Sequence, residues 1–161
     1  MNSVNDAIAF VLEKSKFMLR RFTADLSSQE YLHRPTEKAN CAAWLIGHLT
    51  LADRRMLKLL DVAAPEVPAG FEHRFSREEG CPQAGEFGDV HTLLPIFDQH
   101  RDALIAAVKK ASPEQLNKPV EKPMPMFSTV GEAIAFMALH TSMHTGQITI
   151  IRRSLGRPPM I

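Results

Sequence analysis

Two histidines late in the sequence, His140 and His144, have the spacing that allows both to bind one metal ion. They are four residues apart, so in a helix their side chains lie side by side, with Cβ atoms about 5–6 Å apart. A neutral imidazole offers a nitrogen lone pair near pH 7, and histidine is the commonest metal ligand. In a chain with seven histidines such a pair can arise by chance. The spacing alone is therefore weak evidence for a metal.

The surroundings of three histidines give stronger evidence. His140, His144 and His48 each fall on a helical stripe of otherwise apolar side chains. A polar ring among such side chains needs a hydrogen-bonding or metal partner. Three histidines with open coordination positions are typical of a catalytic centre, because structural zinc sites are closed by four protein ligands. We predict a divalent metal on these three residues, and the alternative is a set of hydrogen-bonded core histidines.

The other residues that could contribute chemistry are less well supported. Asp53, expected on the polar back face of its helix, and His100 are candidates for a general base. The histidines expected on solvated loops or helix ends are His33, His73 and His91. A di-iron carboxylate centre needs two E-x-x-H motifs on core helices. One such motif is present, at Glu30, and it lies on a short peripheral segment, so this class of site is excluded.

For several uncharged residues, a structural role is favoured over a role in the site. Trp44, one turn before His48, is expected to anchor the core, and the alternative is that it forms a wall of the site. Gly146 lies inside a predicted helix, where glycine usually marks close packing or access. Cys41 and Cys81 fit neither a disulfide framework nor a C-x-x-C pair, and Cys41 is expected to be a small buried hydrophobe.

The spacing of apolar residues predicts four long amphipathic helices, capped at Ser3, Asn40, Asp89 and Thr129. They cover roughly 3–22, 40–61, 89–111 and 129–154. A proline- and glycine-rich connection over 62–88 is long enough to cross the domain, and it is expected to be a lid or a binding loop. Residues 118–128 are expected to form a loop, and no strand pair is predicted. The chain is therefore expected to be an all-α four-helix bundle.

Composition restricts the class of protein further. With 161 residues, 45% hydrophobic and 23% charged, the sequence is typical of one soluble domain over 1–161. A net charge of +1 argues against nucleic acid as a partner. The sequence contains no apolar run of the roughly 20 residues needed to cross a membrane. Residues 1–6 lack the features of a signal peptide, so a cytoplasmic location is expected.

Two segments of the sequence resemble the DinB-like superfamily, also called DinB/YfiT-like metalloenzymes. They are Trp44-Leu45-Ile46-Gly47-His48-Leu49, followed by Arg54-Arg55, and His140-Thr141-Ser142-Met143-His144-Thr145-Gly146-Gln147. Residues 30–35 match the short helix that usually precedes the first motif, and residues 151–156 match the end of the last helix. The resemblance covers nearly the whole chain.

The resemblance implies a bundle with an up-down-down-up course and a long crossover between the second and third helices. It implies a divalent metal held by His48, His140 and His144, with water completing the coordination, and a homodimer. Some relatives are thiol-dependent transferases or isomerases that use mycothiol or bacillithiol. Some isomerase relatives have an acidic ligand where this chain has His140, and many members have a basic residue in place of Thr145.

These considerations favour a metal-dependent enzyme that acts on a small-molecule substrate. The expected reactions are transfer to or from a low-molecular-weight thiol, such as bacillithiol or mycothiol, or hydrolysis. Three nitrogen ligands suit zinc or nickel first, with iron, cobalt, manganese or copper as alternatives. A bundle that binds a metal or a ligand without turnover is the second hypothesis.

Overall fold

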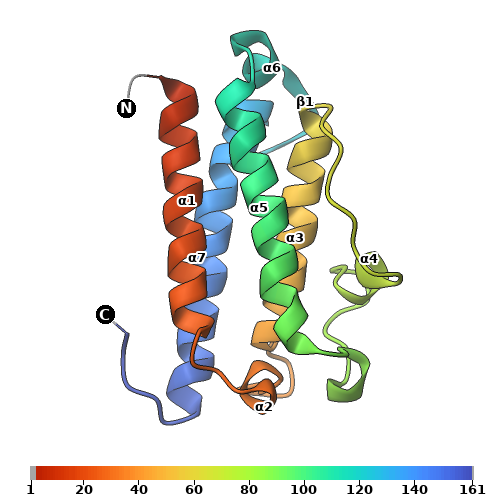
Figure 1. The fold of residues 1–161 in the computed structure, drawn as a ribbon, viewed down its shortest axis with the longest axis vertical. Helices are drawn as coiled ribbons and strands as arrows, with labels where there is room; N and C mark the ends of the chain where they lie inside the picture. The colour runs from red at the N-terminus through yellow and green to blue at the C-terminus, as the bar shows by residue number, and fades with distance from the viewer. Residues whose placement is uncertain (1–2, 161) are drawn as a thin grey trace.

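The computed structural model describes residues 3–160, without the side chains of residues 122–124 (Figure 1). Residues 1, 2 and 161, which the predicted domain includes, lie outside the described part. The four long helices are α1 (Val4–Thr23), α3 (Ala42–Leu59), α5 (Leu93–Lys110) and α7 (Val130–Ser154). The all-α prediction is thus confirmed. Within residues 3–160, every helix is too short or too polar to cross a lipid bilayer.

The long helices form a ring in which α5 and α7 each lie between α1 and α3. In Figure 1, α1 and α7 run downward, whereas α3 and α5 run upward. Because α3 and α5 are parallel, the chain between them must return along the length of the bundle. This crossover contains α4 (Phe71–Arg74) and two 3-10 turns, η1 (Ala84–Glu86) and η2 (Val90–Thr92).

Two predicted helix starts are confirmed, one is wrong, and one lies four residues before the α-helix itself. Ser3 caps α1, and Thr129 forms a capping box with Glu132 at the start of α7. Helix α3 instead begins after Cys41, which makes no side-chain capping bond, so Asn40 is not the cap. Asp89 caps the short turn η2, and α5 begins only at Leu93.

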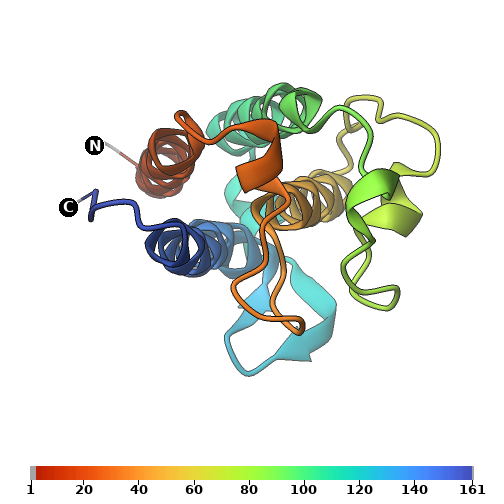
Figure 2. The same cartoon turned by 90° about the horizontal axis from the view of Figure 1, so that it is seen from below.

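Residues 118–128 contain a strand pair that the sequence analysis did not predict. Strand β1 (Pro119–Met124) pairs antiparallel with β2 (Phe127–Thr129), after the short helix α6 (Pro113–Asn117). The prolines concealed this hairpin, because proline is normally confined to edge strands. The hairpin projects from the side of the bundle in the end-on view (Figure 2).

The crossover covers the outer face of α3. Phe71, Phe75 and Phe87 are buried in the same apolar cluster as the first half of this helix. Phe75 packs so closely on Gly47 that a Cβ atom there would lie 2.3 Å from the ring. Helix α3 is therefore buried almost all round as far as Asp53, which is fully buried. The prediction of a polar back face at Asp53 is wrong.

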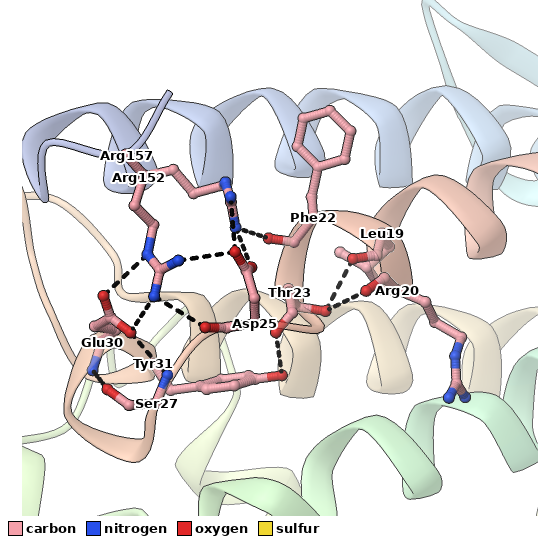
Figure 3. Close-up of polar contacts among 10 residues, drawn as sticks. All are labelled: Leu19, Arg20, Phe22, Thr23, Asp25, Ser27, Glu30, Tyr31, Arg152 and Arg157. Carbon is pink, nitrogen blue, oxygen red and sulfur yellow. Dashed lines mark hydrogen bonds and ion pairs between the residues drawn. The ribbon is translucent and has the colours of Figure 1, made fainter. Parts of the chain in front are cut away.

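An arginine clamp joins the end of α7 to the segment after α1 (Figure 3). Arg152 donates to the Phe22 carbonyl, 3.1 Å away, and pairs with the Asp25 carboxylate. Arg157 forms a bidentate pair with Glu30, at 3.0 and 2.7 Å, and reaches Asp25 at 2.8 Å. Glu30 belongs to the short helix α2 (Ser28–Tyr31). The clamp gives a structural role to two of the segments that carry the family resemblance.

Candidate metal centre

The structure brings His48, His140 and His144 together, although more than half of the chain separates the first from the other two. His48 projects from α3, and the other two are one turn apart on α7. The ring centroid of His48 lies 5.2 Å from that of His140 and 5.3 Å from that of His144. One nitrogen of each ring lies within 4.8 Å of the others. This is the one such group of potential metal ligands within the described residues.

Neighbouring groups orient two of the three rings. Nδ1 of His144 lies 2.7 Å from Oε1 of Gln147. Since an amide oxygen only accepts, Nδ1 carries the proton and Nε2 of His144 carries the lone pair. That Nε2 lies 2.9 Å from Nε2 of His140. The His48 ring donates a hydrogen bond to the backbone of Phe75, in the crossover.

Aromatic side chains flank the cluster on both sides. The Trp44 ring stacks on His48 with centroids 4.9 Å apart and an angle of 5° between planes. Trp44 is also buried in the core, so it anchors the core and supports the site at once. Phe136 stacks on His140 at 6.3 Å. Within the described residues, Nε1 of Trp44 and Nδ1 of His140 are buried without a hydrogen-bond partner.

The environment keeps all three imidazoles neutral. Burial, together with the positive charges of Arg55 and Arg77, lowers the pKa of His48 to about 4. Burial and the neighbouring histidines lower the pKa of His140 to about 3, and burial also lowers the pKa of His144. A histidine must be neutral to bind a metal, so these shifts favour metal binding near pH 7.

The three residues fit a divalent metal. They provide three neutral nitrogen donors, and the Nε2 lone pair of His144 is directed at the neighbouring ring. Hydrogen bonds from the remote nitrogens of metal-binding histidines normally fix the ring orientation, as Gln147 does here. His48 is buried, whereas His140 and His144 are half-buried. One side of the cluster is thus accessible, as an open coordination site requires.

The two residues considered as a general base lie elsewhere in the bundle. Asp53 forms a bidentate ion pair with Arg101, at 2.7 and 3.0 Å. Burial raises the pKa of Asp53 and the Arg101 charge opposes this shift. His100 is buried against the backbone, with Nδ1 2.7 Å from the Ile96 carbonyl and Nε2 3.1 Å from that of Pro65. Neither residue joins the histidine cluster.

Arg101 is an interior residue that the sequence analysis missed. It is fully buried, and it also donates to the hydroxyl oxygens of Ser15 and Thr141, each 2.9 Å away. Its position was detectable, because Arg101 follows Phe97 by four residues and precedes Leu104 by three. It therefore lies on the apolar stripe of α5.

The remaining residues that were singled out lie away from the cluster or make local contacts. His33 bonds to Ser154 and His91 to Ser28, whereas His73 is exposed beside Glu79. His33 is half-buried, so it is less solvated than expected. No atom beyond the helix itself would lie within 4 Å of a Cβ at Gly146, so close packing does not explain this glycine.

A cleft lies along the second half of α3, between this helix and the crossover, and none of the three histidines lines it. Its volume is about 710 Å³, and its walls include Leu51 and Arg55 of α3, which follow His48 on the same side of the helix. Lys58 and Ser76 also line it. Ser76 directly follows Phe75, whose backbone bonds to His48. The cleft therefore begins one helical turn beyond His48, at Leu51.

Comparison with known proteins agrees with these observations. The family model of the DinB superfamily matches residues 12–148, which include all three histidines and the arginine–aspartate pair. No curated protein and no solved structure matches the chain. A match over most of the chain establishes membership, and the chain belongs to the DinB superfamily.

Proposed function

We propose that this protein is a metal-dependent enzyme that uses His48, His140 and His144 to hold one divalent ion, with zinc or nickel the preferred metals. The observation that carries the proposal is the convergence of three neutral imidazoles with one accessible side. When bound, such an ion acts as a Lewis acid and lowers the pKa of a coordinated water or thiol.

The chain's own residues would set the geometry and the charge of the reaction site. Gln147 holds His144 in one tautomer, and Trp44 and the Phe75 backbone fix the His48 ring. Burial of His48 excludes water from the inner side of the cluster. Orientation of this kind reduces the reorganisation that a reaction requires.

Positive charge beside the cluster supports an anionic substrate or cosubstrate. Arg77 acts electrostatically on all three histidines, and Arg55 acts on His48. The nearby Asp53 carboxylate is already paired with Arg101. The site would thus combine a divalent ion with the positive charges of Arg55 and Arg77. A low-molecular-weight thiol that binds as thiolate would satisfy this charge, which favours the thiol-transferase version over hydrolysis.

The first test is the metal content of tag-free protein, measured by elemental mass spectrometry for wild type and His144→Ala. We expect about one divalent ion per wild-type chain and nearly none in the variant. His91→Ala, which removes an exposed histidine outside the cluster, is the matched control and should retain the metal. Wild type without metal after reconstitution would contradict the proposal.

A second test separates a thiol transferase from a hydrolase. In cobalt-substituted protein, addition of bacillithiol, mycothiol, glutathione or cysteine should change the visible absorption if sulfur enters the coordination sphere. A spectrum that none of these thiols changes would reject the transferase version. Screening small esters and amides would then test hydrolysis.

The expected homodimer has support on the outer face of α7. Leu139, Met143 and Ile150 are each about 60% exposed, and Gly146 lies on the same face. Large exposed apolar side chains that share one helix face are typical of protein interfaces. Sedimentation should show a dimer for wild type and a monomer for Met143→Glu, with Val62→Glu as a control outside this face. A monomeric wild type would rule the dimer out.

A further inference from the structure

Cys41 and Cys81 lie next to each other although forty residues separate them. Their Sγ atoms are 3.7 Å apart, which is too far for a disulfide and close enough for a hydrogen bond between two thiol groups. Cys41 is fully buried at the start of α3, whereas Cys81 is half-buried in the crossover. The pair therefore has one enclosed sulfur and one that small molecules can reach.

Other groups hold the two sulfurs in this arrangement. Arg34 donates to the Cys81 carbonyl at 2.8 Å and also contacts the Pro82 carbonyl. These bonds hold the backbone at Cys81 in place beside α3. The guanidinium group also brings a positive charge near the Cys81 sulfur.

The two cysteines differ in their chemistry. The Cys81 sulfur accepts hydrogen bonds from the Cys41 thiol and backbone, and these bonds lower the pKa of Cys81 to about 6. The hydrogen bond to Cys81 and burial raise the pKa of Cys41. A position near a helix N-terminus and an arginine is the usual environment of a reactive cysteine. Cys81 is thus the nucleophile of the pair, and Cys41 is the adjacent thiol that can resolve its oxidation product.

We propose that Cys41 and Cys81 form a redox-active dithiol that hydrogen peroxide converts to an intramolecular disulfide. The Cys81 thiolate attacks one peroxide oxygen, the O–O bond breaks, and the hydroxide released takes up a proton to form water. Cys81 is then a sulfenic acid. The Cys41 sulfur attacks the Cys81 sulfur, the S–O bond breaks, and hydroxide leaves with the Cys41 proton as a second water. Two thiols are oxidised and one peroxide is reduced.

The disulfide would fasten the crossover to Cys41, the residue directly before the helix that carries His48. The same crossover supplies Phe75, which contacts Gly47 and bonds to His48. Oxidation would therefore restrict movement of the segment that covers this side of the histidine cluster. A cross-link of this kind also restricts the unfolded chain, so the oxidised protein should melt at a higher temperature.

The direct test is oxidation of the intact wild-type protein with a small excess of hydrogen peroxide, followed by alkylation under denaturing conditions and mass measurement. We expect the number of alkylated thiols to fall from two to none and the mass to fall by two hydrogen atoms. Tryptic peptides 39–54 and 78–101 should be recovered as one cross-linked species that dithiothreitol separates.

Two variants test the separate roles of the sulfurs. Cys41→Ser should accumulate a Cys81 sulfenic acid that dimedone traps, whereas Cys81→Ser should leave Cys41 reduced under the same conditions. The proposal would be overturned if wild type kept both thiols, formed only intermolecular disulfides, or oxidised Cys81 beyond the sulfenic acid while Cys41 stayed alkylatable. The wild-type measurement decides the matter even if a variant fails to fold.

Discussion

Two polar clusters lie inside the bundle, and they differ in how completely their atoms are paired. In the arginine cluster, Arg101 donates four hydrogen bonds, two to Asp53 and one each to Ser15 and Thr141. In the histidine cluster, Nε2 of His140 and Nε2 of His144 form one hydrogen bond, 2.9 Å long, and Nδ1 of His140 has no partner within the described residues. The two clusters are adjacent, because Thr141 follows His140.

The difference indicates different roles. Buried polar groups in native proteins are nearly always hydrogen-bonded, and a fully paired set of groups acts as part of the fold. A buried ring nitrogen without a partner lowers stability unless a ligand satisfies it, so such groups are more often functional. We therefore assign the arginine cluster to stability and the histidine cluster to binding, and the predictions below test that division.

The largest expected effect is on stability, from Asp53→Asn. This change leaves the buried Arg101 charge without a counter-ion, which should cost about 3–5 kcal/mol of unfolding free energy in urea denaturation. The matched control is Asp102→Asn, which removes an exposed partner of Lys16 and should cost less than about 1 kcal/mol. Equal losses in the two variants would mean that the buried pair has no special role in the fold.

Substitution of Gly47 tests how the crossover supports the histidine cluster. In Gly47→Ala the new methyl group would overlap the Phe75 ring, and the required displacement should cost about 1–3 kcal/mol by urea denaturation. Metal affinity should fall as well, because Phe75 bonds to His48.

Gly146→Ala is the control for this substitution, because it makes the same chemical change in open space. It should be neutral or stabilise the helix by up to about 1 kcal/mol. A Gly47→Ala protein as stable as Gly146→Ala would refute close packing at Gly47.

Gln147→Leu should weaken metal binding with little change in stability. The substitution removes the group that fixes the His144 tautomer, and losses of this kind typically reduce metal affinity by about 10–100-fold. Competition with a chromogenic chelator measures the affinity. Ser142→Ala, an exposed change on the same helix, should leave it unaltered. If Gln147→Leu also binds normally, Gln147 does not orient His144.

The last prediction concerns the pH dependence of stability. His48 and His140 have pKa values of about 4 and about 3 in the folded protein, against an ordinary value of 6.5. The unfolded chain therefore binds more protons below pH 6.5, and the metal-free protein should lose stability as the pH falls from 6.5 toward 4.

The slope of this loss should not exceed about 1.4 kcal/mol per pH unit for each histidine. Glu30, whose pKa the Arg157 pair lowers from 4.5 to about 2, should add its loss only below pH 4.5. His140→Gln should reduce the slope only between pH 6.5 and about 4, where the histidines contribute. Urea denaturation at a series of pH values measures the slope. A slope that is unchanged in this variant would mean that His140 is not neutral in the folded state.

The sequence was sufficient where a local pattern determines the structure. Apolar spacing and capping residues predicted the four long helices, and the i, i+4 spacing predicted that His140 and His144 would be neighbours. His48 was associated with them through its apolar stripe and the family resemblance. The structure places all three rings together.

The rest depended on tertiary contacts that a local pattern does not contain. Asp53 was expected to be solvated because three charged residues share that part of α3, but the crossover covers it. The proximity of Cys41 and Cys81 likewise follows from the path of the crossover. The hairpin at 119–129 was missed because its prolines resemble those of a loop.

The contact between Gly47 and Phe75 defines the smallest part of this protein that could be transplanted. A designer who copied His48, His140 and His144 onto an ordinary antiparallel bundle would leave His48 without its backbone partner and with space where Phe75 packs. The graft would need residues 71–77 as well as the two helix segments. Such a scaffold must therefore have two parallel neighbouring helices, since a short loop between antiparallel helices has no return segment to carry Phe75.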